Sequence, residues 1–175
     1  MKKKVLMSLI LLAIIGTSAV WAQQATLDKL TFTRINNNTA VSVRCVNTQI
    51  SGEVVIPDTY EGLPVTTIPN NGFMNCNNFT SIVIPASVST IGTAAFPGGV
   101  ISVTFRGSST QFASDNLFGA GNTRDGGADL RAKYRAGGAG TYTREAGGSR
   151  GTNVWTKLAG QTVCPHCGGT GFISR

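Results

Sequence analysis

The chain has 175 residues, enough for one domain, and its 15 basic residues against 8 acidic ones give a formal net charge of +7. The sequence contains a single histidine, and its acidic residues are scattered, which argues against sites built on a catalytic histidine or on paired carboxylates. No glycine-rich segment has the spacing of a phosphate-binding loop. We therefore predict a protein without enzymatic activity.

The first 22 residues have the form of a signal peptide. Three lysines, Lys2 to Lys4, precede an apolar run from Val5 to Ile15, and the small residue Ala22 closes the segment. The run is shorter than the roughly 20 apolar residues needed to span a bilayer. We expect cleavage after Ala22 and an exported protein, located in the periplasm, on the outer surface or in the medium. After cleavage we expect no membrane-spanning segment.

Basic residues and glycine are concentrated in the second half of the chain. Residues 23–105 are near neutral, whereas residues 106–175 contain nine basic residues against four acidic ones. Tyr134, Tyr142 and Trp155 lie among these basic residues, a pattern also found in proteins that bind single-stranded nucleic acid. The export signal argues against a nucleic-acid partner. We expect the three aromatic residues to pack the closing segment onto the last repeat instead.

An internal repeat occupies the middle of the chain. The segment at 65–68, Val-Thr-Thr-Ile, recurs 23 residues later at 88–91 as Val-Ser-Thr-Ile, and Phe73 and Phe96 follow the two copies. An apolar run ending in Ile-Pro precedes each copy, and residues 103–105 begin a partial third copy. One such unit cannot bury its own apolar side, so the units are expected to stack with their strands parallel.

The alternation of side chains along these short strands predicts two faces. The side chains expected in the core are Val54, Ile56, Ile82, Ile84, Val103 and Phe105. The side chains expected on the opposite, exposed face are Glu53, Val55, Ser81, Val83, Ser102 and Thr104. We predict that this exposed face binds a protein or a cell-surface ligand.

Residues 50–106 resemble the BspA-like, Treponema-type leucine-rich repeats in their Ile-Pro pairs, their Val-x-Thr-Ile segments and the phenylalanine that follows. Residues 32–44 resemble the hairpin that often opens such arrays, and residues 130–144 with Trp155 resemble the closing segment of short spirochaetal members. The resemblance implies a β-rich solenoid, a short parallel stack with an N-terminal hairpin cap and a loop-rich C-terminal cap. It also implies a surface or secreted protein used for adhesion and protein binding, with no required cofactor.

Four segments follow from these observations: a signal peptide (1–22), a cap with repeats (23–106), a glycine-rich basic cap (107–160) and a cysteine tail (161–175). We expect the N-terminal hairpin over residues 30–46, parallel layers up to residue 106, and a short helix near residues 130–134. Cys45 and Cys76 lie far apart in the sequence, and each is expected to be a small apolar residue of the stack.

The tail contains the motif Cys164-Pro-His-Cys167, followed by Gly-Gly-Thr-Gly. It resembles one unit of the Cys-x-x-Cys-x-Gly-x-Gly zinc modules of the J-domain co-chaperones. Two thiolates at this spacing can bind zinc, and the missing ligands could come from His166, from another chain, or from Cys45 and Cys76. A Cys164–Cys167 disulfide and a catalytic dithiol are the alternatives. The second functional hypothesis is therefore a zinc-binding or thiol-redox accessory role of the tail.

Overall fold

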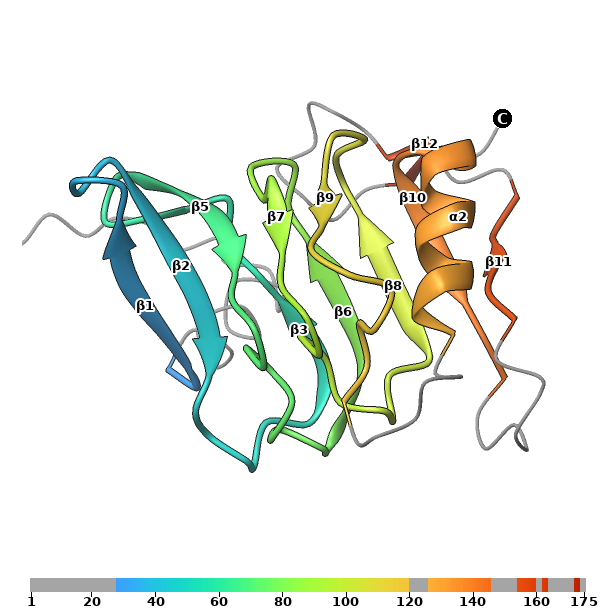
Figure 1. Ribbon diagram of the computed structural model, residues 1–175, viewed down its shortest axis with the longest axis horizontal. Coiled ribbons are helices and arrows are strands. Elements are labelled where there is room, and N and C mark those ends of the chain that lie inside the picture. Colours follow the sequence, from blue (N-terminus) through green and yellow to red (C-terminus); the bar gives the residue numbers. More distant parts are fainter. Residues whose placement is uncertain (1–27, 120–125, 146–153, 160–161, 164–171, 174–175) are drawn as a thin grey trace, which may run out of the picture.

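The computed structural model describes residues 28–119, 126–145, 154–159, 162–163 and 172–173. Two β-sheets lie face to face, with a helix at one end (Figure 1). Sheet A contains β1 (Leu30–Ile35), β2 (Ala40–Cys45), β5 (Leu63–Ile68), β7 (Thr90–Ile91) and β9 (Gln111–Phe112) in that order, with β4 (Thr59–Tyr60) paired to β5. Sheet B contains β11 (Thr156–Lys157), β10 (Gly140–Thr143), β8 (Ser102–Phe105), β6 (Phe79–Ile84) and β3 (Gly52–Val55) in that order. The helix is α2 (Gly127–Gly137), and β12 (Thr162–Val163) pairs with β13 (Phe172–Ile173).

The chain winds between the two sheets as a solenoid. It passes from β3 to β5, from β6 to β7 and from β8 to β9, and each strand lies parallel to its counterpart in the next coil. Pro85 directly follows β6, and Pro57 follows β3 after one intervening residue. A proline ends a strand because it has no N–H to donate to the neighbouring strand. Each sequence repeat is therefore one coil, and the predicted β-solenoid is confirmed.

The parallel stack continues beyond residue 106, where we expected it to end. Gln111 and Phe112 pair with Thr90 and Ile91 of the coil before, and Phe118 forms a bridge with Phe96. The third coil has no Ile-Pro pair, and its sheet A strand reads Gln-Phe instead of Thr-Ile. Without those residues the sequence offers no motif that marks the second half of this coil.

A column of buried aromatic rings runs through the stack. Phe73, Phe96 and Phe118 come from successive coils, with ring centroids 6.3 Å and 5.9 Å apart. Trp155 stacks on Phe118 at 5.5 Å and forms the last ring of this aromatic column. All four side chains have 0% exposure. The phenylalanine that recurs in the sequence is thus the residue that joins one coil to the next.

The N-terminal hairpin is confirmed. β1 and β2 pair antiparallel over six residues each, and β2 continues sheet A by lying parallel to β5. Asn36, Asn37 and Asn38 at the tip have positive φ angles of 51°, 53° and 65°, a conformation that asparagine tolerates better than most residues. Phe32 stacks on Tyr60 with a centroid distance of 4.0 Å, which holds the hairpin against β4.

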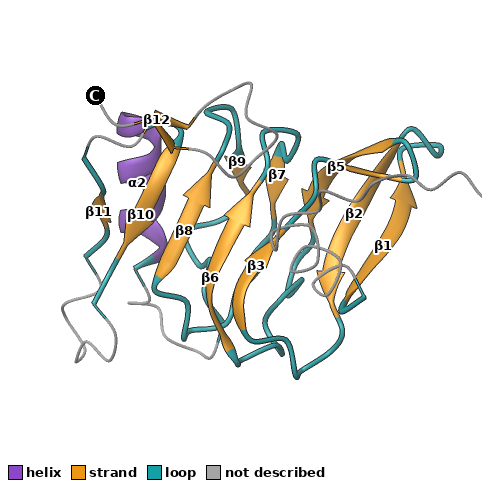
Figure 2. Cartoon of the chain, turned by 180° about the vertical axis from the view of Figure 1, so that it is seen from behind, coloured by secondary structure: helices purple, strands orange, loops and turns teal. Residues whose placement is uncertain are grey.

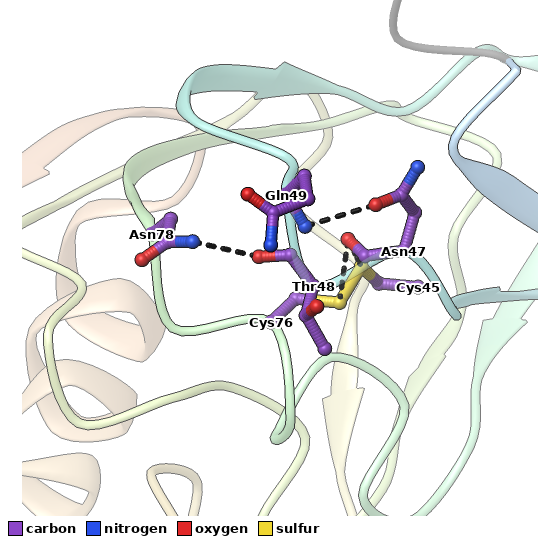
Figure 3. The surroundings of a disulfide bond; sticks show 6 residues. All are labelled: Cys45, Asn47, Thr48, Gln49, Cys76 and Asn78. Carbon is purple, nitrogen blue, oxygen red and sulfur yellow. Dashed lines mark hydrogen bonds between the residues drawn. A yellow bond between two sulfur atoms is a disulfide. The ribbon is translucent and has the colours of Figure 1, made fainter.

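Cys45 and Cys76 form a disulfide bond, so the prediction of two separate cysteines is wrong (Figure 3). Their Cα atoms lie 6.4 Å apart although 31 residues separate them in sequence. The pairing of β2 with β5 brings the end of the hairpin beside the turn that follows β5, and Cys45 donates its N–H to the Gly72 carbonyl at 2.9 Å. The connection after Cys45 is fixed at the same place, because the Asn78 amide donates to the Thr48 carbonyl at 2.7 Å.

The C-terminal cap closes the other end of the stack. The predicted helix is confirmed as α2, and Leu130 and Tyr134 are its large buried side chains. The Tyr134 hydroxyl accepts the Thr110 N–H at 3.0 Å and donates to the Gly107 carbonyl at 2.8 Å. Tyr142 is fully buried, and burial, with a smaller effect of Tyr134, raises its pKa above the usual value. The expected packing role of these aromatic residues is confirmed.

Candidate binding face

The outer face of sheet B carries two rows of side chains in register. The strands that contribute them lie side by side in Figure 2. The first row consists of Glu53, Ser81, Ser102, Thr143 and Thr156. The second row consists of Val55, Val83, Thr104 and Thr141. Neighbouring strands of a sheet are about 4.8 Å apart, so each row is a regular ladder of small side chains.

The core side of these strands is as predicted. The six side chains expected in the core are completely buried: Val54, Ile56, Ile82, Ile84, Val103 and Phe105. The period of two along each strand therefore holds through the repeats. Because the strands are short and proline or a turn ends each one, the register is fixed coil by coil.

The exposed side is only partly as predicted. Glu53 is exposed, and Val55, Ser81 and Ser102 are half-buried. The prediction is wrong for Val83 and Thr104, which are buried with 7% and 8% exposure. Val83 is covered because it lies on the central strand β6, between Val55 on β3 and Thr104 on β8. Thr104 is covered because its hydroxyl lies 2.9 Å from that of Thr141 on β10.

Sequence reasoning missed the part of the face that the C-terminal cap supplies. β10 and β11 extend sheet B antiparallel to β8, and they add Thr141, Thr143 and Thr156 to the two rows. The alternation Thr141-Tyr142-Thr143 could have indicated this strand, because it places an inward aromatic ring between two outward hydroxyls. The first row therefore spans all five strands of sheet B, two more than the repeats alone provide.

The face is nearly uncharged. No charged residue occurs in the sequence between Glu61 and Arg106. Glu53 is the charged member of the two rows, and its carboxylate accepts a hydrogen bond from the Ser81 hydroxyl at 3.4 Å. Beside the face, Arg106 pairs with Asp58 at 4.0 Å. Such a surface offers hydroxyls, methyl groups and one carboxylate, which fits the binding of a ligand better than the transfer of protons.

Cys164 and Cys167 lie outside the described residues. The strands on either side of them in the sequence, β12 and β13, pair antiparallel, with Val163 opposite Phe172. Cys45 and Cys76 cannot complete a zinc site because they are bonded to each other. In the part of the chain that the structure describes, no three His, Cys, Asp or Glu side chains gather as metal ligands.

Parallel strands that recur coil by coil, with a buried phenylalanine at the same place in each coil, define a leucine-rich-repeat solenoid of about three turns. Residues 64–123 match the family model of the BspA type leucine rich repeat region. Such repeats are typical of protein–protein interaction. No helix among the described residues is long and apolar enough to cross a membrane.

The crystal structure of a T. pallidum leucine-rich-repeat protein, TpLRR, is similar at 22% identity and a TM-score of 0.38. The similarity covers 51% of this chain and 39% of that one, so the chain spans less than half the length of TpLRR. Comparison with curated proteins finds no match. The resemblance of the tail to the zinc modules of J-domain co-chaperones has no support in these comparisons.

Proposed function

We propose that this chain is an exported protein that binds a protein or a cell-surface ligand through the outer face of sheet B. The observation that carries the proposal is the register of the first row across the sheet, because its five side chains are exposed or half-buried. A partner can lie across several strands at once and meet a similar side chain at each step. The repeat family adds support, since its members are used for protein interaction.

Two features support export. Residues 1–22 have the charge, the apolar run and the small residue of a signal peptide. The Cys45–Cys76 disulfide is of a kind that persists in oxidising compartments and is rare in the cytosol. Adhesion at a cell surface would follow from export together with ligand binding.

Two lysines on the outer face of sheet B are expected to weaken ligand binding by about tenfold or more, because they place unpaired charges in the contact. The variant is Ser81→Lys with Thr143→Lys, both in the first row and separated by β8. A partner identified by pull-down is purified, and its affinity for both proteins is measured by calorimetry. An unchanged affinity would show that this face is not the binding site.

The matched control carries the same two charges on sheet A. The control variant is Thr67→Lys with Gln111→Lys. These two residues lie in one row across sheet A, with β7 between them, just as β8 lies between Ser81 and Thr143. This control is expected to keep the affinity of the unmodified protein. If both variants lose binding equally, the added charge is responsible and the position is not.

A second candidate function is zinc binding by Cys164 and Cys167. The Cys-x-x-Cys spacing in the sequence supports it, because two thiolates at this spacing can bind one zinc ion. Zinc requires four ligands, so His166 or a second chain would have to contribute. A Cys164–Cys167 disulfide is the alternative state of the same pair.

Native mass spectrometry distinguishes these states of the tail. A zinc site predicts added mass of one zinc ion, which a chelator removes, and the Cys164→Ala, Cys167→Ala variant should lack it. The Cys45→Ala, Cys76→Ala variant should retain the metal, because those sulfurs are already bonded to each other. A mass lower by two further protons, without metal, would show a tail disulfide and would contradict zinc binding.

A further inference from the structure

The Cys45–Cys76 bond joins the N-terminal cap, here β1, β2 and their connection (residues 30–45), to the rest of the solenoid. The cap contributes two strands to sheet A and none to sheet B. In Figure 1 it is the blue end of the stack. Every complete coil is held through both sheets, whereas the cap is held through sheet A alone.

The backbone pairing between the cap and the first coil is short and irregular. β2 and β5 share the pairs Val41–Val65 and Ser42–Thr67, with a shift of register between them. In sheet A, β5 and β7 also share only two pairs, but the coils are joined a second time in sheet B, where β6 and β8 form four consecutive pairs without a break. The Cys45 N–H bond to Gly72 adds one contact, but it lies directly beside the disulfide. The backbone therefore holds the cap less firmly than it holds the coils.

The buried apolar side chains of the cap are Leu30, Ala40, Val41, Val43 and Cys45. Phe32 and Tyr60, by contrast, are only partly buried where they stack. The Arg34–Glu61 ion pair is 54% and 56% exposed, so solvent screens it strongly. Attachment through one sheet and an exposed ion pair favour local opening of this segment before the whole protein unfolds.

We infer that the disulfide is a redox-dependent lock on the cap. With the bond formed, the cap closes the end of sheet A; with the bond reduced, the cap opens while the coils stay folded. Opening would uncover the edge of β5, including Val65, which is now completely buried. The lock does not depend on which ligand the outer face of sheet B binds.

The chemistry is thiol–disulfide exchange with a dithiol. One thiolate of the reagent attacks the Cys45 sulfur, which is the more exposed of the two, and the Cys76 thiolate leaves and takes up a proton. The second thiol of the reagent then attacks the mixed disulfide. The reagent ends as a cyclic disulfide, and the protein ends with two thiols. Reduction thus transfers two electrons and two protons to the protein, and oxidation reverses the step.

Hydrogen exchange followed by mass spectrometry tests the lock on the purified full chain, with and without a dithiol. In the reduced protein, amide exchange in residues 30–45 is expected to become about tenfold faster or more, while peptides from β6 and β8 keep their rates. The Cys45→Ala, Cys76→Ala variant should exchange like the reduced protein and should not respond to the reagent. The Cys164→Ala, Cys167→Ala variant should respond like the unmodified chain.

Three outcomes would overturn the inference. If the exchange of residues 30–45 does not change on reduction, the other contacts hold the cap and the bond locks nothing. If β6 and β8 accelerate as much as the cap, the bond stabilises the whole fold instead of one end. A response that disappears in the Cys164→Ala, Cys167→Ala variant would assign the redox effect to the tail.

Discussion

Replacing Phe96 with alanine is expected to lower the free energy of unfolding by about 4 kcal/mol, within the range of buried Phe→Ala changes. Phe96 is completely buried and contacts Phe73 on one side and Phe118 on the other. Removal of the ring leaves a cavity between two coils. The backbones of these coils cannot move together to close it, because they are already hydrogen bonded to each other. One of these bonds runs from the Phe96 N–H to the Leu117 carbonyl at 3.0 Å. Chemical denaturation followed by circular dichroism measures the effect.

Two control variants separate the ring from the position. Phe96→Leu keeps most of the volume and should cost less than about 1.5 kcal/mol. Thr90→Ala, on the exposed outer side of β7 in the same coil, should change stability by less than about 0.5 kcal/mol. If Phe96→Ala costs no more than Thr90→Ala, the aromatic column does not hold the coils together.

The repeats could be predicted from the sequence because their signals are local. Ile84-Pro85, the Val88 to Ile91 segment and Phe96 all lie within one coil, and one coil is copied at a near-constant spacing. The alternation of side-chain direction along the same short strands correctly placed residues such as Ile82 in the core, although Val83 and Thr104 on the other side are buried as well. Local patterns repeated in register are sufficient to define this type of fold.

The features that were missed depend on contacts between distant segments. The disulfide joins Cys45 to Cys76 across 31 residues, and neither cysteine belongs to a motif that names its partner. The burial of Thr104 depends on β10, which is separated from β8 by the 34 residues 106–139. Strand β10 runs antiparallel to β8, whereas the strands of the repeats pair in parallel. The spacing of the repeat therefore could not predict the position of β10.

The binding face is therefore built from two sources. The repeats supply Glu53, Ser81 and Ser102, while the C-terminal cap supplies Thr143 and Thr156. A cap of this kind removes the open edge of the last coil and at the same time widens the face. Any change that detaches the cap should consequently affect both stability and binding.

Trp155 is the residue on which attachment of this cap depends most. It stacks on Phe118 with an interplanar angle of 14°, and the Arg144 guanidinium lies 5.0 Å from its ring. Its backbone N–H donates to the Asp129 carboxylate at 2.7 Å, which links β11 to α2. Trp155→Ala is expected to lower the free energy of unfolding by about 3–5 kcal/mol, because it removes the last ring of the aromatic column.

The indole N–H provides the control for this prediction. The Trp155 Nε1 atom is buried and has no hydrogen-bond partner among the described residues, so its loss removes no bond to them. Trp155→Phe retains a ring over Phe118 and should cost less than half as much as Trp155→Ala in denaturation followed by circular dichroism. Equal losses for the two variants would mean that one stacked six-membered ring is not sufficient and that the full indole is needed to hold the cap in place. A small loss for both would show that α2 and β10 hold the cap without Trp155.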